Sequence, residues 1–465
     1  MSGIGFLQHR LRICRTTARS ADFSGLRITN AGTGSHGRGR GRRIIAAGLL
    51  AAIAATGASC TSDGPATETS HAAESSILDT GSPALRPSEA NASIPVAAST
   101  GASDGAAEPA GAPMPNDVAK RLDMAIEAAV AEAFIPGASV GVWSPQGDYV
   151  QGFGLADKET KQAMEPSMFM RIGSETKTFL VTGVLLLVDE GKVSLDDPIG
   201  RYLAGVPNGD AITIRELAGM RTGLPDYTDN PRFWQKFYDD RSAGWRPEEL
   251  LSYAFGEPLL FDPGASFNYS NTNAILLGLL IEKVTGTPLP DFIEDRVATP
   301  LKLTSTKFPR DATFATPHAQ GYTSQAGAVT EIATDWNPSW AWAAGAMISN
   351  VPDLGRWAKE VATGALLSPR TQAERVAFQV SDGGRYGLGL WELDGWVGHS
   401  GFLPGYQGLT VYNAAADTTM VVLVNTDIIA AQGTKAYYPP DLIAKEIAEI
   451  MTPDHPYDPP PPPAG

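Results

Sequence analysis

The spacing of apolar side chains divides the chain into a few regular elements. Over residues 118–134 they recur every three to four positions, which predicts an amphipathic helix capped by Pro115-Asn116. Residues 138–143 and 149–153 are rich in β-branched and aromatic side chains around a turn at Gly147, which predicts two paired strands. We therefore expect the folded region to open with a helix and a β-hairpin.

The pattern becomes helical again in the middle of the chain. A short extended lead over 167–172 is followed by a strongly apolar helix, predicted from Ser174 to Gly191. The stretch of about 195–345 is predicted to be mostly helical with Pro- and Gly-rich loops, and its clearest helix covers 272–284.

After Trp391 the pattern indicates strands and a closing amphipathic helix. The predicted strands cover residues 396–400, 407–412 and 419–424, and the predicted helix covers residues 441–451. Strands at both ends of the folded region with helices between them predict one sheet whose edges come from distant chain segments.

Composition separates the two ends of the chain from this folded region. Residues 60–115 are rich in Ala, Ser, Thr, Gly and Pro and poor in large apolar side chains, which predicts a disordered spacer. The proline-rich end is predicted to be unordered around 458–463. The predicted layout is an export signal at 1–59, a spacer at 60–115, a folded domain at 116–455 and a tail at 456–465.

Charge supports the export prediction. The first 59 residues hold nine Arg, no Lys and one acid, a net charge of +8, and the whole-chain charge of −15 leaves −23 for the rest. A basic segment before an apolar run of roughly 12–16 residues is typical of a signal peptide and too short for a membrane span. The acidic remainder argues against nucleic acid as a partner.

The small residues that lead up to Cys60 resemble a bacterial lipobox. Cys60 is therefore predicted to be lipidated, which would anchor the protein in the membrane. The predicted location is the cell envelope, on the outer face of the cytoplasmic membrane. The alternative is a secreted protein.

Three short motifs carry reactive side chains: Ser174-Glu175-Thr176-Lys177, Tyr269-Ser270-Asn271 and His399-Ser400-Gly401. A serine at a helix N-terminus lies where unpaired N–H groups can stabilise an oxyanion, and Lys177 follows on the same face. A lysine desolvated at this place has a lowered pKa and can accept the serine proton. The alternative, an N-capping serine beside a solvated lysine, is less consistent with so apolar a helix.

The second and third motifs can supply the rest of such a site. Tyr269 and Asn271 precede a predicted helix, so a proton-relaying phenol and a substrate-binding amide would be held on a rigid loop. A simple helix-capping loop is the alternative. Gly401 ends a predicted strand and would let a substrate approach its edge. The three histidines of the folded region form no pair with metal-ligand spacing, so neither a metal nor a cofactor is predicted.

Taken together, the motifs resemble the serine β-lactamase-like superfamily, which includes D-alanyl-D-alanine carboxypeptidases, class C-type β-lactamases, esterases and D-aminopeptidases. The resemblance covers about residues 118–451. It extends to the segments 212–217, 222–224, 267–271, 345–349 and 398–401. It implies an α/β (α+β) fold in which an antiparallel β-sheet is flanked by helices, with a mostly helical subdomain as the other wall of the cleft.

The resemblance also implies a role for each site residue. Ser174 would be the acylated nucleophile, Lys177 its base and Tyr269 a proton shuttle. The backbone N–H groups of Ser174 and Phe402 would form the oxyanion hole. The substrate-binding positions would be Asn271, His399, Ser400, Gly401 and Phe402.

His399 stands where many relatives have a lysine, which resembles the D,D-peptidase and esterase branches. A neutral histidine anchors a carboxylate less well than a permanent cation. We predict an exported serine hydrolase that acts through an acyl-enzyme, most simply a D,D-carboxypeptidase on D-Ala-terminated peptides such as a peptidoglycan stem peptide. The alternatives are an esterase or weak β-lactamase on the same scaffold, or a penicillin- or muropeptide-binding protein without turnover.

Overall fold

Of the 465-residue chain, the computed structural model describes residues 111–325, 327, 330–432 and 435–462. The predicted signal at 1–59, the predicted lipidation site Cys60 and most of the predicted spacer lie outside the described residues and stay predictions. Within the described part, no helix is both long and apolar enough to cross a membrane.

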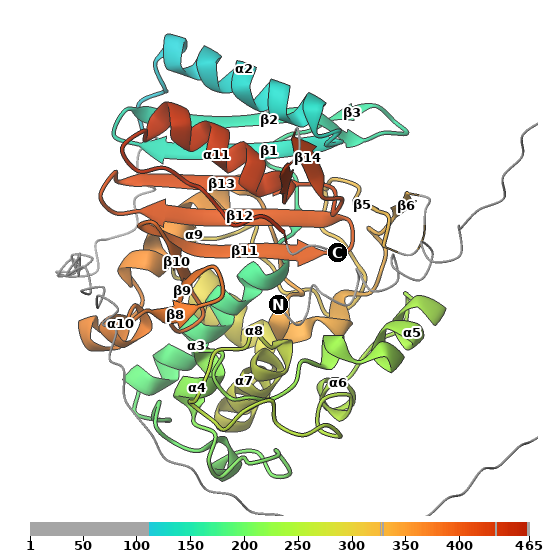
Figure 1. The fold of residues 1–465 in the computed structure, drawn as a ribbon, viewed down its shortest axis with the longest axis vertical. Coiled ribbons are helices and arrows are strands. Elements are labelled where there is room, and N and C mark those ends of the chain that lie inside the picture. The colour runs from blue at the N-terminus through green and yellow to red at the C-terminus, as the bar shows by residue number, and fades with distance from the viewer. Residues whose placement is uncertain (1–110, 326, 328–329, 433–434, 463–465) are drawn as a thin grey trace, which may run out of the picture. The chain divides into compact units, whose positions relative to one another are not determined.

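A nine-stranded antiparallel sheet lies at the centre of the described region (Figure 1). Strands from the N-terminal and C-terminal parts of the described region pair within the sheet. There β1 (Gly137–Ser144) pairs with β13 (Thr418–Val424), and Val140 lies opposite Val422. The strand order is β3-β2-β1-β13-β12-β11-β10-β9-β8. The predicted antiparallel sheet built from distant segments is confirmed.

The other strands of this sheet are β2 (Gly147–Asp157), β3 (Gln162–Ala163), β8 (Gln379–Ser381), β9 (Gly384–Tyr386), β10 (Trp391–Leu393), β11 (Trp396–Leu403) and β12 (Tyr406–Asn413). Three short pairs lie outside it: β4 (Met170–Arg171) with β7 (Ile348–Ser349), β5 (Tyr322–Thr323) with β6 (Glu331–Ile332), and β14 (Ala430–Gln432) with β15 (Lys435–Tyr437). Because β10 pairs with β11 only at 396–398, the second half of β11 is an open edge on that side.

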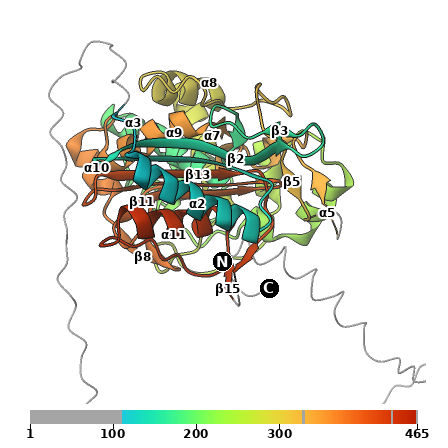
Figure 2. The same ribbon diagram turned by 90° about the horizontal axis from the view of Figure 1, so that it is seen from above.

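Helices cover both faces of the sheet, as the view from above shows (Figure 2). One face carries α2 (Asn116–Glu132) and α11 (Pro439–Met451), and the other carries α3 (Thr176–Asp189) and α9 (Val351–Thr363). Side chains alternate along β13, so Val422 packs in the core with α2 and α11 while Leu423 joins the core on the α3 side.

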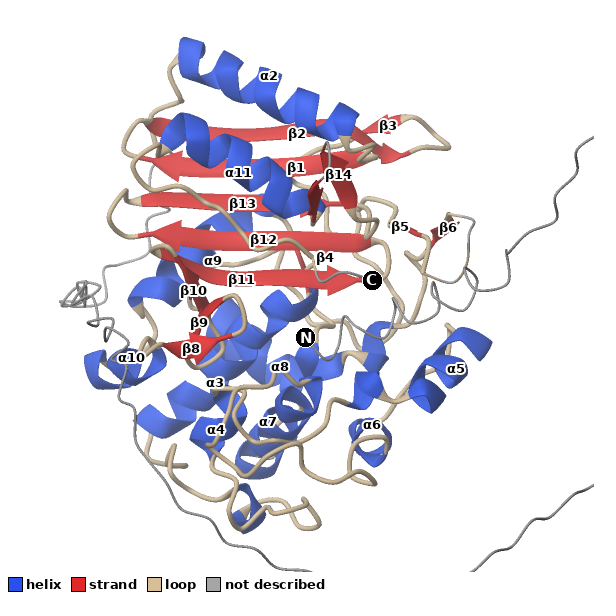
Figure 3. Cartoon of the chain, in the orientation of Figure 1, coloured by secondary structure: helices blue, strands red, loops and turns tan. Residues whose placement is uncertain are grey.

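A mostly helical part lies beyond the β11 side of the sheet (Figure 3). Its most buried helix, α7 (Asn271–Thr285), packs against α3. The shorter helices are α4 (Ile214–Ala218), α5 (Pro231–Asp239), α6 (Pro247–Ser252), α8 (Leu289–Ile293) and α10 (Pro369–Arg375). The predicted combination of a flanked sheet with a helical part is confirmed.

The first helix differs from its predicted form at both ends. Pro115 occupies the N-cap position without a side-chain hydrogen bond, and Asn116 is already the first helical residue. At the other end the helix stops at Glu132, and Phe134, predicted to lie on its apolar face, has a φ of +53° and is 91% exposed. A residue in the left-handed region cannot continue the helix, so Phe134 leaves the apolar stripe.

The prediction of an unordered proline-rich end is wrong as far as Pro462. Tyr457 is buried, donates a hydrogen bond to Asp441 Oδ1 at 2.7 Å, and meets the Trp396 ring edge-on at 6.3 Å. Pro459 and Pro462 are buried as well. Composition alone could not reveal this, because the tail packs on α11 and β11 rather than forming an element of its own.

Candidate active site

Ser174 lies in a 3-10 turn, Gly173–Glu175, that leads directly into α3. Gly173 has a φ of +53°, and a Cβ atom on it would lie 2.4 Å from the backbone N of Phe402. Only glycine allows the turn to approach β11 this closely. The serine is therefore held between the N-terminus of α3 and the edge strand.

Lys177 is almost fully buried and donates three hydrogen bonds from Nζ. The acceptors are Ser174 Oγ at 3.0 Å, Asn271 Oδ1 at 2.8 Å and the Ala344 carbonyl oxygen at 2.7 Å. Burial lowers the pKa of Lys177 to about 7, and the Asp226 carboxylate opposes the shift. A substantial fraction of the amine is then neutral at physiological pH and can accept the Ser174 proton.

Tyr269 directly precedes the Ser270 N-cap of α7, and its ring centroid lies 4.9 Å from Lys177 Nζ. Burial raises the pKa of the Tyr269 phenol above its usual value of 10, and a hydrogen bond with Ser174 opposes the rise. The phenol therefore stays protonated at neutral pH. It is placed to pass a proton to or from the vicinity of Ser174 Oγ.

The Asn271 carboxamide is oriented by Asp226, a residue that the sequence did not single out. The backbone N and the side-chain Nδ2 of Asn271 both donate to Asp226 Oδ2, at 2.9 Å each. Asp226 is buried, and Oδ1 accepts from the backbone N of Thr228 at 2.9 Å. With Nδ2 fixed in this way, Asn271 Oδ1 points at Lys177.

His399 is buried on β11, and both of its ring nitrogens have partners. Nδ1 lies 2.6 Å from the Ser400 carbonyl oxygen and Nε2 lies 3.3 Å from the hydroxyl of Tyr386 on β9. Because a carbonyl oxygen can only accept, Nδ1 carries the proton and Nε2 accepts from the phenol. Burial lowers the pKa of His399 to about 3, with a further contribution from Lys177, so the ring is neutral at pH 7.

The aromatic rings of Tyr269, Tyr386 and His399 form one continuous side of the site. Their centroids lie 6.2 Å apart for the two tyrosines and 6.1 Å for each tyrosine–histidine pair. Phe267 extends this surface, with its ring 5.5 Å from that of Tyr386. Next to Ser174 the site therefore presents a mostly apolar, uncharged wall.

Gly401 and Phe402 bring the backbone of β11 against the nucleophile turn. A Cβ atom on Gly401 would lie 1.8 Å from the Ile172 carbonyl oxygen and 3.3 Å from the backbone N of Ser174. Since a Cβ atom on Gly173 would lie 2.4 Å from Phe402 N, the two N–H groups predicted to form an oxyanion hole come from backbone segments in direct contact.

Ser400 is placed differently from its neighbours on β11. It is exposed, and it lies opposite Leu409, whose side chain packs in the core with α2 and α11. Because side chains alternate along a strand, the Ser400 hydroxyl belongs to the face opposite that of His399.

The structure thus brings Ser174, Lys177, Tyr269, Asn271 and His399 together from three distant segments. Residues that sequence reasoning missed are Asp226, Tyr386 and the Ala344 carbonyl. A signal existed for Asp226 and Ala344, which lie two residues after the segment 222–224 and one residue before the segment 345–349 that carry part of the family resemblance. For Tyr386 there was none.

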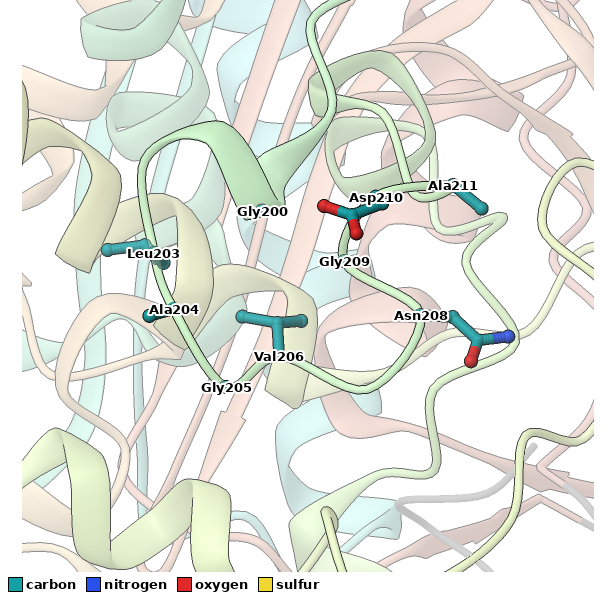
Figure 4. A pocket seen from close by; sticks show the side chains of 9 residues that line it. All are labelled: Gly200, Leu203, Ala204, Gly205, Val206, Asn208, Gly209, Asp210 and Ala211. Atoms are coloured by element: carbon teal, nitrogen blue, oxygen red, sulfur yellow. The ribbon is translucent and has the colours of Figure 1, made fainter.

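A separate hollow lies within the loop formed by residues 200–211 and has a volume of about 510 Å³ (Figure 4). Glycine, alanine and aliphatic side chains line most of it, with Asn208 and Asp210 as its polar members. None of the site residues described above lines this hollow. In the described part of the chain, His, Cys, Asp and Glu form no group of three or more that could hold a metal ion.

A helix-terminal serine, a buried lysine one turn later and a strand edge against both define a serine hydrolase site on a β-lactamase-type fold. Residues 122–439, more than half of the chain, match the Beta-lactamase family, and the chain belongs to that family. The resemblance stated from the motifs is therefore confirmed.

Among curated proteins, Protein flp of Staphylococcus aureus (strain MRSA252) is 28% identical over 251 residues, which cover 52% of this chain and 49% of that protein. The chain thus spans about half the length of such relatives. Among solved structures, a D-stereospecific amidohydrolase from Streptomyces sp. is 31% identical, with a TM-score of 0.64 over 72% of this chain and 98% of that chain. A D-amino acid amidase from Ochrobactrum anthropi SV3, complexed with L-phenylalanine amide, is 25% identical, with a TM-score of 0.64 over 73% and 99%.

Proposed function

We propose that this protein is a serine amidohydrolase that cleaves the amide bond following a D-amino-acid residue through an acyl-enzyme on Ser174. The observation that carries the proposal is the 3.0 Å contact between Lys177 Nζ and Ser174 Oγ, made by a buried amine whose pKa is lowered to about 7. The similarity to a D-stereospecific amidohydrolase and a D-amino acid amidase supports the D-configured acyl group.

The contacts around Ser174 suggest the following steps. The Ser174 hydroxyl gives its proton to neutral Lys177 as Oγ attacks the amide carbon, and the carbonyl oxygen becomes an oxyanion near the N–H groups of Ser174 and Phe402. As the C–N bond breaks, the proton held by Lys177 reaches the departing amine, with Tyr269 as the relay. Water then attacks the Ser174 ester, gives its proton back through Lys177, and releases the acid and the free serine.

The state of His399 indicates which kind of leaving group the site accepts. Its Nδ1–H group donates a hydrogen bond to the Ser400 carbonyl oxygen, and Nε2 accepts one from the Tyr386 hydroxyl. The ring is neutral at pH 7. Such a ring offers neither charge nor a free donor to a substrate carboxylate, which favours an uncharged amide over a free C-terminal acid as the leaving side. A D,D-carboxypeptidase, which cleaves the same kind of bond, is the second candidate on the strength of the motif resemblance.

The proposal is tested with the full chain and four probes. D-phenylalanine amide, L-phenylalanine amide and a D-Ala-D-Ala-terminated peptide report turnover, and a fluorescent penicillin reports acylation of Ser174. We expect the D-amide to be hydrolysed faster than the L-amide, and Ser174→Ala to lose both turnover and labelling. An unchanged rate in Ser174→Ala would refute the assignment of the nucleophile.

The same probes separate the remaining alternatives. Faster cleavage of the D-Ala-D-Ala peptide than of the D-amide would favour the carboxypeptidase. Rapid loss of the penicillin label would indicate a β-lactamase, and a persistent label without turnover of any probe would indicate a binding protein. A nitrophenyl ester cleaved in the absence of amide turnover would indicate an esterase.

A further inference from the structure

Two glycines that face each other across β11 and β12 form the surface on which the nucleophile turn lies. Gly401 pairs directly with Gly408. A Cβ atom on Gly401 would lie 1.8 Å from the Ile172 carbonyl oxygen, and one on Gly408 would lie 2.4 Å from Glu175 Oε1. Residues 172–175 therefore rest on bare backbone, since any larger side chain at these two positions would push the turn off the sheet.

The Glu175 side chain fills the space left open at Gly408. Although this residue adjoins the nucleophile, it is only 1% exposed. Thr410 Oγ1 on β12 donates to Glu175 Oε2 at 2.7 Å, and within the described residues Oε1 has no hydrogen-bond partner. A buried carboxylate with one neutral donor is strongly disfavoured, so the geometry calls for a protonated acid.

The electrostatic surroundings agree with a neutral Glu175. Burial raises the pKa of Glu175 to about 8, and the hydrogen bond from Thr410 opposes the rise only in part. On the neighbouring elements, the site residues Lys177 of α3 and His399 of β11 are titratable, and neither contributes to the pKa shift of Glu175. β12 and β13 face it with uncharged residues, namely Gly408, Thr410 and Leu423.

Thr410 connects this contact to the rest of the site. It lies directly opposite His399 in the β11–β12 pairing, so the two side chains lie on the same face of the sheet. The Glu175–Thr410 hydrogen bond thus fixes the nucleophile turn to the strand pair that also carries His399 and the predicted oxyanion N–H of Phe402.

We propose that Glu175 is a positioning residue that acts as a neutral acid: by filling the Gly408 gap and binding Thr410, it sets the distance between Ser174 and the Phe402 N–H group of β11. This inference rests on the proposed acyl-enzyme function. A negative charge at Glu175 would also compete with the oxyanion for the positive N-terminus of α3, so the neutral form matters for chemistry as well as for packing.

The test compares Glu175→Gln, Glu175→Ala and Thr410→Val in the full chain. Glutamine keeps the shape and a hydrogen-bonding group without a titratable proton, whereas alanine empties the Gly408 gap. Asp441→Ala is the matched control, because Asp441 is also a buried acid with one hydrogen bond, from Tyr457, but lies on the α11 face of the sheet. Thermal unfolding of each variant shows that it is folded at the assay temperature.

We expect Glu175→Ala to lower kcat for the D-amide by about 10- to 100-fold with KM within about twofold, as displacing a reacting group by an ångström can do. Thr410→Val should lie between Glu175→Ala and wild type. For the wild type we expect the rate to fall above about pH 8, where Glu175 would lose its proton. Glu175→Gln should keep the neutral-pH rate within about threefold and should not show this fall. Asp441→Ala should lower stability and leave kcat unchanged.

Two results would overturn the inference while leaving the proposed function intact. In both cases the wild type hydrolyses the D-amide. In the first, Glu175→Ala is folded and has the same kcat as the wild type, and in the second, Glu175→Gln loses as much activity as Glu175→Ala. A wild type that reacts with no probe, by contrast, would refute the proposed function itself, and with it the role assigned to Glu175.

Discussion

Replacing Asp226 with asparagine tests whether the Asp226 carboxylate positions Lys177, the proposed base, through the carboxamide of Asn271. Asp226 Oδ2 accepts two hydrogen bonds from Asn271, whose Oδ1 in turn accepts from Lys177 Nζ. An asparagine has the same shape and keeps one oxygen, but its amide cannot accept at both former carboxylate oxygens. The change therefore removes a charge and at least one hydrogen bond without creating a cavity.

The magnitude follows from those bonds. A hydrogen bond to a charged acceptor contributes about 1.5–3 kcal/mol net. Losing one of them in Asp226→Asn gives an expected cost of about 2 kcal/mol, which corresponds to a kcat/KM about 30-fold lower if the misplaced Asn271 no longer directs Lys177.

The pH profile of kcat/KM should also shift in a direction that a merely structural defect would not produce. The Asp226 carboxylate raises the pKa of Lys177 against the larger effect of burial, so removing it must lower that pKa further below about 7. Because the proposed mechanism uses the neutral amine as the base, the acid limb of kcat/KM should move to lower pH. The variant should thus fall behind the wild type less at pH 6 than at pH 8.

The assay is the pH profile of kcat/KM for the D-amide. Asp353→Asn is the control, because Asp353 is also a buried acid, with hydrogen bonds from the Ser305 backbone N at 2.7 Å and Thr306 Oγ1 at 3.1 Å, but lies on α9. It should lower stability without changing the profile. An acid limb unmoved or raised in Asp226→Asn would refute the reasoning.

Two further predictions follow from single contacts. Lys177→Arg should lower the acylation rate by about 10²- to 10⁴-fold at every pH, because a guanidinium keeps its proton, whereas the wild-type acylation rate should rise as the pH passes through about 7. Stopped-flow labelling with penicillin measures both rates, and a variant whose acylation rate still changes near pH 7 would point to another base. Tyr457→Ala should lower the free energy of unfolding by about 3 kcal/mol in guanidinium denaturation while leaving kcat unchanged, since it removes a buried ring against Trp396 and a hydrogen bond to Asp441. An unchanged denaturation midpoint would mean that the packing of Tyr457 does not stabilise the fold.

The long elements were predictable because the spacing of apolar residues within each of them indicates which side chains are buried. The strands at 138–143 and 419–424 became β1 and β13, and the apolar helix after Ser174 became α3. By contrast, β8, β9 and β10 have three residues each, which is too few for an alternation to be read. Tyr386, which donates to His399, lies on one of these short strands and was missed for that reason.

The site shows the same division between local and long-range information. The motifs identify Ser174, Lys177 and Tyr269, because each motif keeps its reactive group beside a predicted helix. Glu175 belongs to the first motif as well, yet on local grounds an acid at a helix N-terminus is an ordinary exposed residue. Its burial depends on Gly408, more than two hundred positions away, and no pattern around residue 175 reveals that glycine.

Burial explains why the assembled site suits an oxyanion. It lowers the pKa values of Lys177 and His399 and raises those of Glu175 and Asp226, so each group is pushed toward its neutral form. Glu175 and His399 are neutral at pH 7, and when Lys177 is neutral as well, Asp226 is the one group of this set that can still carry a charge. Because the Asn271 carboxamide lies between Asp226 and Lys177, the electrostatic field of the N-terminus of α3 stays available to the oxyanion. Since that electrostatic field is in place before the substrate arrives, no side chain has to reorganise when the negative charge develops.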